Sequence, residues 1–263
     1  MTSTIGRRTQ VNDPGVDVWR MFSQEFWDDR YSGAPVFSGN PNPWLVHHAE
    51  DLTPGTALDV GSGEGADVLW LASRGWHVTG ADISPVALAR SARLAERAGP
   101  RITARVTWQQ ADMLDFDAPE NSFDLVSAQF MHLPGPTLKA LHRRLAAAVK
   151  PGGTLLLVLH VPPEPGTGNL TFPADMFPTA EQMASVLDPA RWTIDAGTHQ
   201  RPANDATSTT GHTHDVVLHA VRRPAPPRTA TTEQRAVSGY WSLTEARWSP
   251  GPGKVVADRR WPQ

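Results

Sequence analysis

The chain of 263 residues contains no cysteine. Disulfide bonds, iron–sulfur clusters and catalysis by a cysteine thiolate are therefore excluded. Lys and Arg number 24 against 27 Asp and Glu, so the chain has no basic excess for binding a nucleic-acid backbone. It also lacks an apolar run of about 18 residues, and its polar start has no signal-peptide core. We expect neither nucleic acid nor a membrane as a partner, and a cytoplasmic location.

Hydrophobic residues make up 40% of the sequence, which is enough for the core of one α/β domain. We predict three parts: an N-terminal helical segment (1–45), a core (46–223) and a disordered tail (224–263). The tail is rich in Pro, Thr and Arg and has no hydrophobic periodicity, which is typical of disorder. Its three tryptophans leave open a strap that docks on the core or on a second subunit in a homodimer.

The central pattern is a strand, a glycine-rich turn and a helix. Residues 56–60 have the composition of a buried strand, glycines follow at 61, 63 and 65, and apolar residues then recur at helical spacing. Glycines permit positive φ and close approach of a ligand, and the free amides of the helix start would face it. The pattern also fits a dinucleotide-binding loop. Asp59 and Glu64, however, would repel a pyrophosphate and suit a ligand with positive charge.

S-adenosylmethionine matches that description, because it carries a sulfonium and an ammonium group and no phosphate. The stretch around Asp59 and its glycines resembles the first motif of class I S-adenosylmethionine-dependent methyltransferases. Three further features follow in the family's order: Asp82 ends the second predicted strand, Asp112 follows the third, and residues 150–153, Lys-Pro-Gly-Gly, precede the fifth. The resemblance covers roughly residues 50–222. It implies an α/β, doubly wound, Rossmann-like, seven-stranded and mostly parallel sheet with an antiparallel final strand, and it makes the N-terminal segment a helical lid.

Periodicity and turn residues place the individual elements. The predicted strands are 56–60, 76–82, 105–109, 123–128, 154–160, 192–196 and 214–221. The main predicted helices are 14–26, one beginning at Pro43, 66–74, 85–98, 136–149 and 179–187. The N-terminal helix is amphipathic, and we expect Trp19 and Phe22 to pack on the core.

The resemblance also implies a set of site residues. Asp82 is expected to accept the ribose hydroxyls, Asp112 to accept from the adenine amino group, and Met113 to cover the adenine ring. The predicted cofactor-binding residues are Asp59, Gly61, Ser62, Gly63, Gly65, Asp82, Ile83, Asp112, Met113, Gln129 and Arg30. The predicted substrate-binding residues are Trp27, Tyr31, His132 and His160, with His132 as the catalytic base. Asp112 as a turn cap and His132 as a packing residue stay open.

The methyl acceptor is expected to be a small molecule. The Asp/Asn-Pro-Pro-aromatic motif of amide- and base-directed N-methyltransferases is missing after the fourth predicted strand. Within the family, residues 27–31 and the helix that opens at Asp67 look nearest to the tellurite-resistance and thiopurine group. Two other hypotheses stay open: a nicotinamide-dependent oxidoreductase and a non-catalytic donor-binding protein. His212 and His214 lack an evident third ligand, so we expect no metal.

Overall fold

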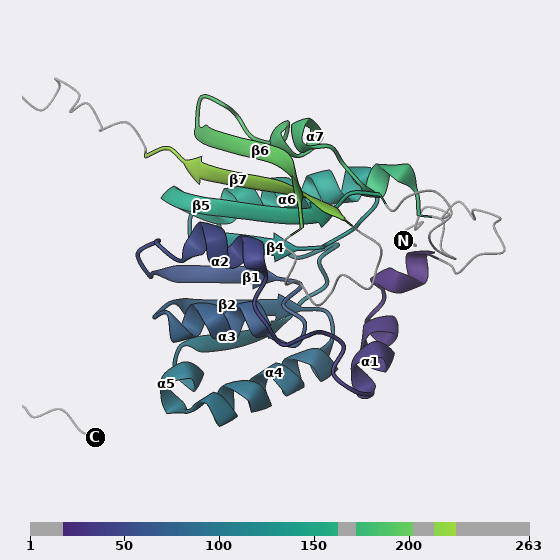
Figure 1. Cartoon of the computed structure of the whole chain (residues 1–263), viewed down its shortest axis with the longest axis vertical. Helices are drawn as coiled ribbons and strands as arrows, with labels where there is room; N and C mark the ends of the chain where they lie inside the picture. The colour runs from purple at the N-terminus through teal and green to yellow at the C-terminus, as the bar shows by residue number, and fades with distance from the viewer. Residues whose placement is uncertain (1–17, 163–171, 202–212, 225–263) are drawn as a thin grey trace, which may run out of the picture. The chain divides into compact units, whose positions relative to one another are not determined.

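The computed structural model describes residues 18–162, 172–201 and 213–224 (Figure 1). Within these residues the strands are β1 (Thr56–Val60), β2 (His77–Asp82), β3 (Val106–Gln110), β4 (Phe123–Gln129), β5 (Val149–His160), β6 (Trp192–Gln200) and β7 (His214–Arg222). They form one sheet in the order β3-β2-β1-β4-β5-β7-β6. β7 is antiparallel to β5 and β6, and the other pairs are parallel. The predicted fold class is thereby confirmed.

Helices cover both faces of this sheet. Within the described residues they are η1 (Val18–Phe22), α1 (Gln24–Ser32), α2 (Pro43–Ala49), α3 (Ala66–Ser73), α4 (Pro85–Ala98), α5 (Pro100–Thr103), α6 (Gly135–Ala148), η2 (Ala174–Met176) and α7 (Ala180–Ala184). In β5, Leu155, Leu157 and Leu159 pack on the face covered by α6, whereas Leu156 and Val158 pack on the face covered by α2 and α3 (Figure 1). The strand is a continuous apolar run because it is buried on both sides.

Helix caps agree with the sequence where a polar side chain precedes proline. The Asn42 side chain accepts from the Trp44 amide at the start of α2, and the Ser84 side chain accepts from the Ala87 amide at the start of α4. The single helix predicted for residues 14–26 is wrong within the described residues. A 3-10 turn ends at Phe22, and Ser23 then caps α1 because its hydroxyl accepts from the Phe26 amide.

Three other boundaries differ from the prediction. β5 begins at Val149 rather than at residue 154, because Val149 pairs with Phe123 through an irregularity in the β4 register. β6 extends to Gln200, since β7 supplies a partner along its whole length. α7 is shorter than predicted and begins with a capping box at Thr179.

Several expectations fall outside the described residues or stay predictions. Residues 1–17 and the predicted tail, apart from Pro224, lie outside them, as does His212. The division into lid, core and tail therefore stays a prediction. Among the described helices, none has the length and apolar character needed to cross a bilayer.

Candidate active site

The turn between β1 and α3 needs its glycines. Gly61, Gly63 and Gly65 have φ values of 73°, 50° and 82°, in the left-handed region that other residues rarely adopt. A side chain at Gly63 would also begin 2.9 Å from the Tyr31 hydroxyl oxygen. One at Gly65 would begin 2.9 Å from Ser91 of α4. The turn is therefore shaped by close packing as well as by backbone conformation.

The first three backbone amides of this turn donate within the protein, whereas the start of α3 has no side-chain cap. The amides of Gly61 and Ser62 donate to the Ala81 carbonyl at 2.8 and 3.1 Å. The Gly63 amide donates to Asp82 Oδ2 at 2.7 Å. These three amides are therefore not available to a phosphate group.

The Asp82 side chain joins the glycine turn to the start of α4. This side chain is buried at the end of β2, where Oδ2 holds the Gly63 amide and Oδ1 accepts from the Ser84 amide at 2.9 Å. Burial raises the pKa of Asp82 above its usual value, although the backbone hydrogen bonds oppose this shift. A carboxylate has about four acceptor sites, so two remain for further donors such as ribose hydroxyls.

Asp59 is buried near the end of β1, just before the turn. Its side chain is 2% exposed and accepts from Ser127 Oγ at 2.7 Å. Burial, together with the charge of nearby Asp67, raises its pKa well above the usual value. Burial also raises the pKa of Asp67 to about 6, against the effect of the Asn42 amide that donates to it at 2.6 Å. The Asp59 carboxyl group is therefore paired inside the protein with β4.

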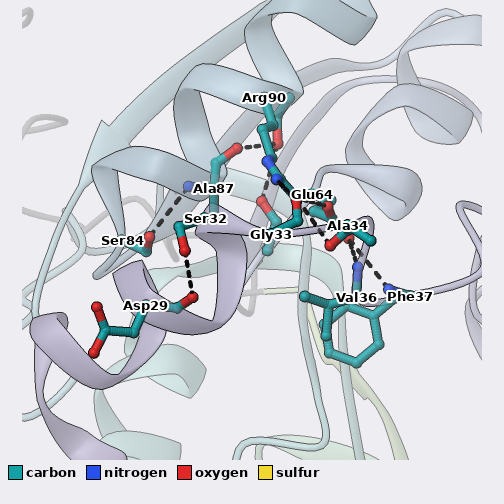
Figure 2. Close-up of polar contacts among 12 residues, drawn as sticks. Asp29, Ser32, Gly33, Ala34, Val36, Phe37, Glu64, Ser84, Ala87 and Arg90 are labelled. Carbon is teal, nitrogen blue, oxygen red and sulfur yellow. Dashed lines mark hydrogen bonds and ion pairs between the residues drawn. The ribbon is translucent and has the colours of Figure 1, made fainter.

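Glu64 faces the N-terminal segment and is paired. Figure 2 shows its carboxylate between Arg90 of α4, at 2.8 Å, and the amides of Val36 and Phe37, at 2.9 and 3.2 Å. Arg90 also donates to the carbonyls of Gly33 and Ala34. We call this set, Glu64 and Arg90 with residues 33–37, the clamp. It fastens the chain after α1 to the glycine turn, and it neutralises the Glu64 charge that the sequence had suggested was directed at a ligand.

A pocket of about 690 Å³ opens beside Asp82, at the carboxyl ends of β2 and β3. Its lining residues come from η1, α1, the ends of these strands with the loops after them, and the start of α6: Trp19, Phe22, Ser23, Gln24, Glu25, Ile83, Gln110, Ala111, Asp112, Leu114, Pro134 and Thr137. Ile83 and Asp112, two of the predicted cofactor-binding residues, therefore line the same pocket. Asp112 Oδ1 also accepts from the Leu114 amide at 2.9 Å, so its role as a turn cap is present too.

Two expectations about this region need correction. Met113 packs in the core and is 5% exposed, so Ala111 and Leu114, rather than Met113, are the apolar neighbours of Asp112 on the pocket wall. Trp19 was expected to pack on the core, but it is 49% exposed and lines the pocket. Phe22 does pack against the core, as predicted.

Two buried polar groups test whether a ligand suits this site. Among the described residues, Ser62 Oγ and both amide atoms of Gln129 are buried without a hydrogen-bond partner. Buried polar atoms are almost always paired, so unpaired ones call for an explanation. Ser62 lies in the turn and Gln129 ends β4, which is the neighbour of β1. A polar ligand over the carboxyl ends of these strands would satisfy both, and S-adenosylmethionine has the required donors and acceptors in its amino-acid part.

The predicted residues of α1 lie on the same side as the turn. Tyr31 is 3% exposed and packs over Gly63, with its ring stacked on Trp27 at 5.8 Å. Burial and the charges of Asp82 and Glu64 raise the pKa of Tyr31. Trp27 donates from Nε1 to the Met21 carbonyl at 2.8 Å. Arg30 is exposed on the same helix.

His132 and His160 meet on the other side of the site. Their rings are 5.4 Å apart, centroid to centroid. His132 Nδ1 lies 3.2 Å from the Met176 carbonyl oxygen, and His132 Nε2 accepts from the His160 amide at 3.4 Å. Both ring nitrogens of His132 thus face backbone groups, an arrangement that favours the packing role left open above.

His160 belongs to a cluster that the sequence reasoning missed. Its Nδ1 lies 2.9 Å from Asp215 Oδ1, and its ring stacks on Phe130 at 3.9 Å. Asp215 Oδ2 accepts from Trp44 Nε1 at 2.9 Å and lies 3.5 Å from Arg201 Nε. We call these five residues the His160 cluster. The one signal in the sequence was the carboxylate of Asp215 at the start of an otherwise apolar strand.

No group of three or more His, Cys, Asp or Glu side chains within the described residues could hold a metal ion.

Comparisons with known proteins agree with this geometry. Residues 57–153 match the family model described as a methyltransferase domain. The chain is 30% identical over 158 residues to phosphoethanolamine N-methyltransferase 2 of Caenorhabditis elegans, covering 58% of this chain and 33% of that protein. It is 31% identical over 160 residues to the ubiquinone biosynthesis O-methyltransferase of Xanthomonas euvesicatoria pv. vesicatoria, covering 59% and 64%.

A solved structure extends the likeness over the fold. The glycopeptide N-methyltransferase MtfA complexed with S-adenosyl-L-methionine superimposes with a TM-score of 0.53 and 19% identity, covering 72% of this chain and 96% of that one. Residues 57–153 are thus similar to a methyltransferase domain, the fold is shared with a methyltransferase solved with S-adenosyl-L-methionine, and these similarities support S-adenosylmethionine as the cofactor. The chain spans only a third of the nematode relative and about two thirds of the bacterial one.

Proposed function

We propose that the whole chain is a methyltransferase that moves a methyl group from S-adenosylmethionine to the O, N or S nucleophile of a small molecule. One observation carries the proposal. A glycine turn whose first three amides are occupied lies beside a buried aspartate with spare acceptor sites, and beside a pocket large enough for an adenosine. This combination suits a ligand with a ribose and no phosphate.

In this proposal the residues divide the donor between them. Asp82 accepts from the ribose hydroxyls, Ile83 and Asp112 bound the adenine pocket, and Ser62 and Gln129 meet the amino-acid part. Gly61, Gly63 and Gly65 let the donor lie close to the backbone, and Asp59 holds the turn from beneath. Arg30 is proposed to close over the donor from α1. Met113 contributes by filling the core behind the pocket.

The protein's main contribution to the chemistry is alignment. The donor supplies an activated methyl carbon, and the chain must hold the acceptor atom about 3 to 3.5 Å away, in line with the departing sulfur. We propose that residues 1–45 act as a lid, with the clamp fixing its inner end over the turn. A closed lid excludes water and preserves this alignment. Trp27 and Tyr31 form its inner wall, and His132 and His160 lie on the acceptor side.

The acceptor class is proposed from the residues on that side. The resemblance to the tellurite-resistance and thiopurine group would favour a soft thiolate or selenolate, which needs no base. His132 and His160 would instead serve an alcohol or amine, which must lose a proton. We also propose a cytoplasmic enzyme, with homodimerisation as an open question for the tail.

Ligand binding is the first test. S-adenosylhomocysteine at about 100 times its dissociation constant should stabilise the protein by about 2.7 kcal/mol, which corresponds to roughly 5 to 10 °C in melting temperature. NAD at the same concentration serves as the matched control. No shift with S-adenosylhomocysteine would overturn the proposal. A larger shift with NAD would overturn it in favour of an oxidoreductase.

Turnover is the second test. Labelled donor should transfer its methyl group to at least one member of a panel of thiols, phenols, amines and oxyanions. Tight donor binding without transfer to any of them would instead support the donor-binding protein without catalysis.

A further inference from the structure

We propose that His160 is the general base of the methyl transfer and that Asp215 is the residue that positions it. The acceptor is then a hydroxyl or amine compound, rather than one that arrives as a thiolate. The inference rests on the proposed function and adds to it the identity of the base and the class of acceptor.

The fold places the two residues opposite each other. His160 is the last residue of β5 and pairs with Asp215, the second residue of β7. Because β7 is antiparallel, its beginning lies at the edge where the parallel strands end. In doubly wound sheets that edge carries the ligands. β5 lies beside β4, on the side away from β1 and its glycine turn, which is the side left for an acceptor.

Asp215 fixes which nitrogen of His160 carries the proton. Trp44 and Arg201 both approach Oδ2, so Oδ1 is left to face His160 Nδ1 at 2.9 Å. A carboxylate can only accept, so a neutral His160 carries its proton on Nδ1. The other nitrogen, Nε2, is then the basic one. Stacking on Phe130 fixes the plane of the ring.

The burial of these charges argues for a role beyond folding. The side chains of Asp215 and Arg201 are 1% and 4% exposed. Moving such a pair out of water costs free energy that its attraction often fails to repay. A hydrophobic pair would hold β6, β7 and α2 together without that cost. His160 is different, because 15% of its side chain stays accessible.

The methyl group is transferred in one displacement step. A lone pair on the acceptor oxygen or nitrogen forms a bond to the methyl carbon, and the carbon–sulfur bond breaks with its electron pair going to sulfur. The proton of the acceptor passes to His160 Nε2. The resulting imidazolium is stabilised through Nδ1 by Asp215, and it later releases the proton to solvent.

The first experiment reads the tautomer directly and needs no acceptor. Nitrogen-15 shifts of the histidine rings, assigned with His160→Asn, should show the Nδ1–H form at a pH where the ring is neutral. In Asp215→Asn, Trp44 and Arg201 should keep the amide oxygen, so the NH2 group should face His160 and convert it to the Nε2–H form. An Nε2–H ring in the parent protein would overturn the proposal. An unchanged tautomer in Asp215→Asn would do so as well.

The second experiment measures turnover of the phenol and amine probes with labelled donor. His160→Asn and Asp215→Asn should each lower turnover by about 100-fold or more, as is usual for loss of a general base. Affinity for S-adenosylhomocysteine, measured by calorimetry, should change by less than about threefold, because neither residue lies on the donor side. His77→Asn, at the opposite end of the sheet, is the matched control and should change neither quantity.

The outcomes separate the two proposals. Full turnover in His160→Asn, or a parent protein that accepts only thiols, overturns the base and leaves the methyltransferase intact. Donor binding without turnover by the parent overturns both. A variant that no longer binds the donor is replaced by His160→Gln, which keeps the polar side chain without a titratable ring.

Discussion

The two halves of the proposed site, one for the donor and one for the acceptor, are built in different ways. The donor half, around β1 and β2, is made largely of backbone: a glycine turn, its hydrogen bonds to Asp82, and an open pocket beside them. The acceptor half, around β5 and β7, is a cluster of side chains that satisfy one another. The comparison teaches that a site for a fixed ligand is formed by local chain geometry, whereas a site that must suit a particular acceptor is assembled from distant side chains.

The largest expected effect is at Asp82, on which the donor half depends. Asp82→Asn keeps the shape but removes the charge and one acceptor, so affinity for S-adenosylhomocysteine should fall tenfold to more than a hundredfold, since charge-assisted hydrogen bonds contribute about 1.5 to 3 kcal/mol. Calorimetry measures this loss. Asp82→Ala should also lower the free energy of unfolding by about 1 to 3 kcal/mol, because the Gly63 and Ser84 amides lose their partner. An unchanged affinity in both variants would show that Asp82 does not bind the donor.

A substitution of Asp67 tests the interaction between the neighbouring carboxyl groups of Asp59 and Asp67. The folded pKa of Asp67, about 6, lies above the ordinary 3.8, so its ionisation destabilises the folded protein as the pH rises between these values. Asp67→Asn should therefore stabilise the folded protein at pH 8 by at most about 3 kcal/mol, which is seen as a rise of a few degrees in melting temperature. This gain should vanish towards pH 4. Asp51→Asn, at an exposed position, is the control. A gain that grows as the pH falls would contradict this assignment.

Sequence reasoning succeeded where contacts are local. Gly63 and Asp82 lie within one strand–turn–helix–strand unit, so the local pattern alone predicts that they lie close together. Glu64 was misinterpreted because its partner, Arg90, is 26 residues away on α4. Asp215 was missed because its meeting with Trp44 spans 171 residues and depends on the register of an antiparallel strand, for which no local pattern exists.

The clamp joins the proposed lid to the donor half of the site. Weakening the clamp therefore tests the donor half separately from the acceptor half. Glu64→Gln keeps the side-chain shape but removes the charge from its bonds to Arg90 and to the Val36 amide. Affinity for S-adenosylhomocysteine should weaken about threefold to tenfold, and protease cleavage near residues 33–37 should become faster. Glu96→Gln, at an exposed position on α4, should have no effect. Equal cleavage rates in the two variants would show that the clamp does not hold the lid.

The smallest effect is expected where β4 and β5 begin, at the end of the sheet away from the proposed site. Lys150 Nζ lies 2.8 Å from Asp124 Oδ2, and both side chains are over a third exposed. Lys150→Met should therefore cost at most about 1 kcal/mol of unfolding free energy in urea denaturation, and donor affinity should not change. A clear loss of donor affinity would mean that the two ends of the sheet are coupled and that the comparison between the halves is too simple.

The position of β7 has a consequence for how the chain acquires its parts during synthesis. β7 comes last among the described strands, yet it lies between β5 and β6. β6 has β7 as its pairing partner in the described sheet, so it must wait for the later strand. Domains fold as their residues leave the ribosome, and contacts between distant residues form late. Residues 61–82 therefore leave the ribosome long before residue 215, and the His160–Asp215 pair can form only after β7 has emerged.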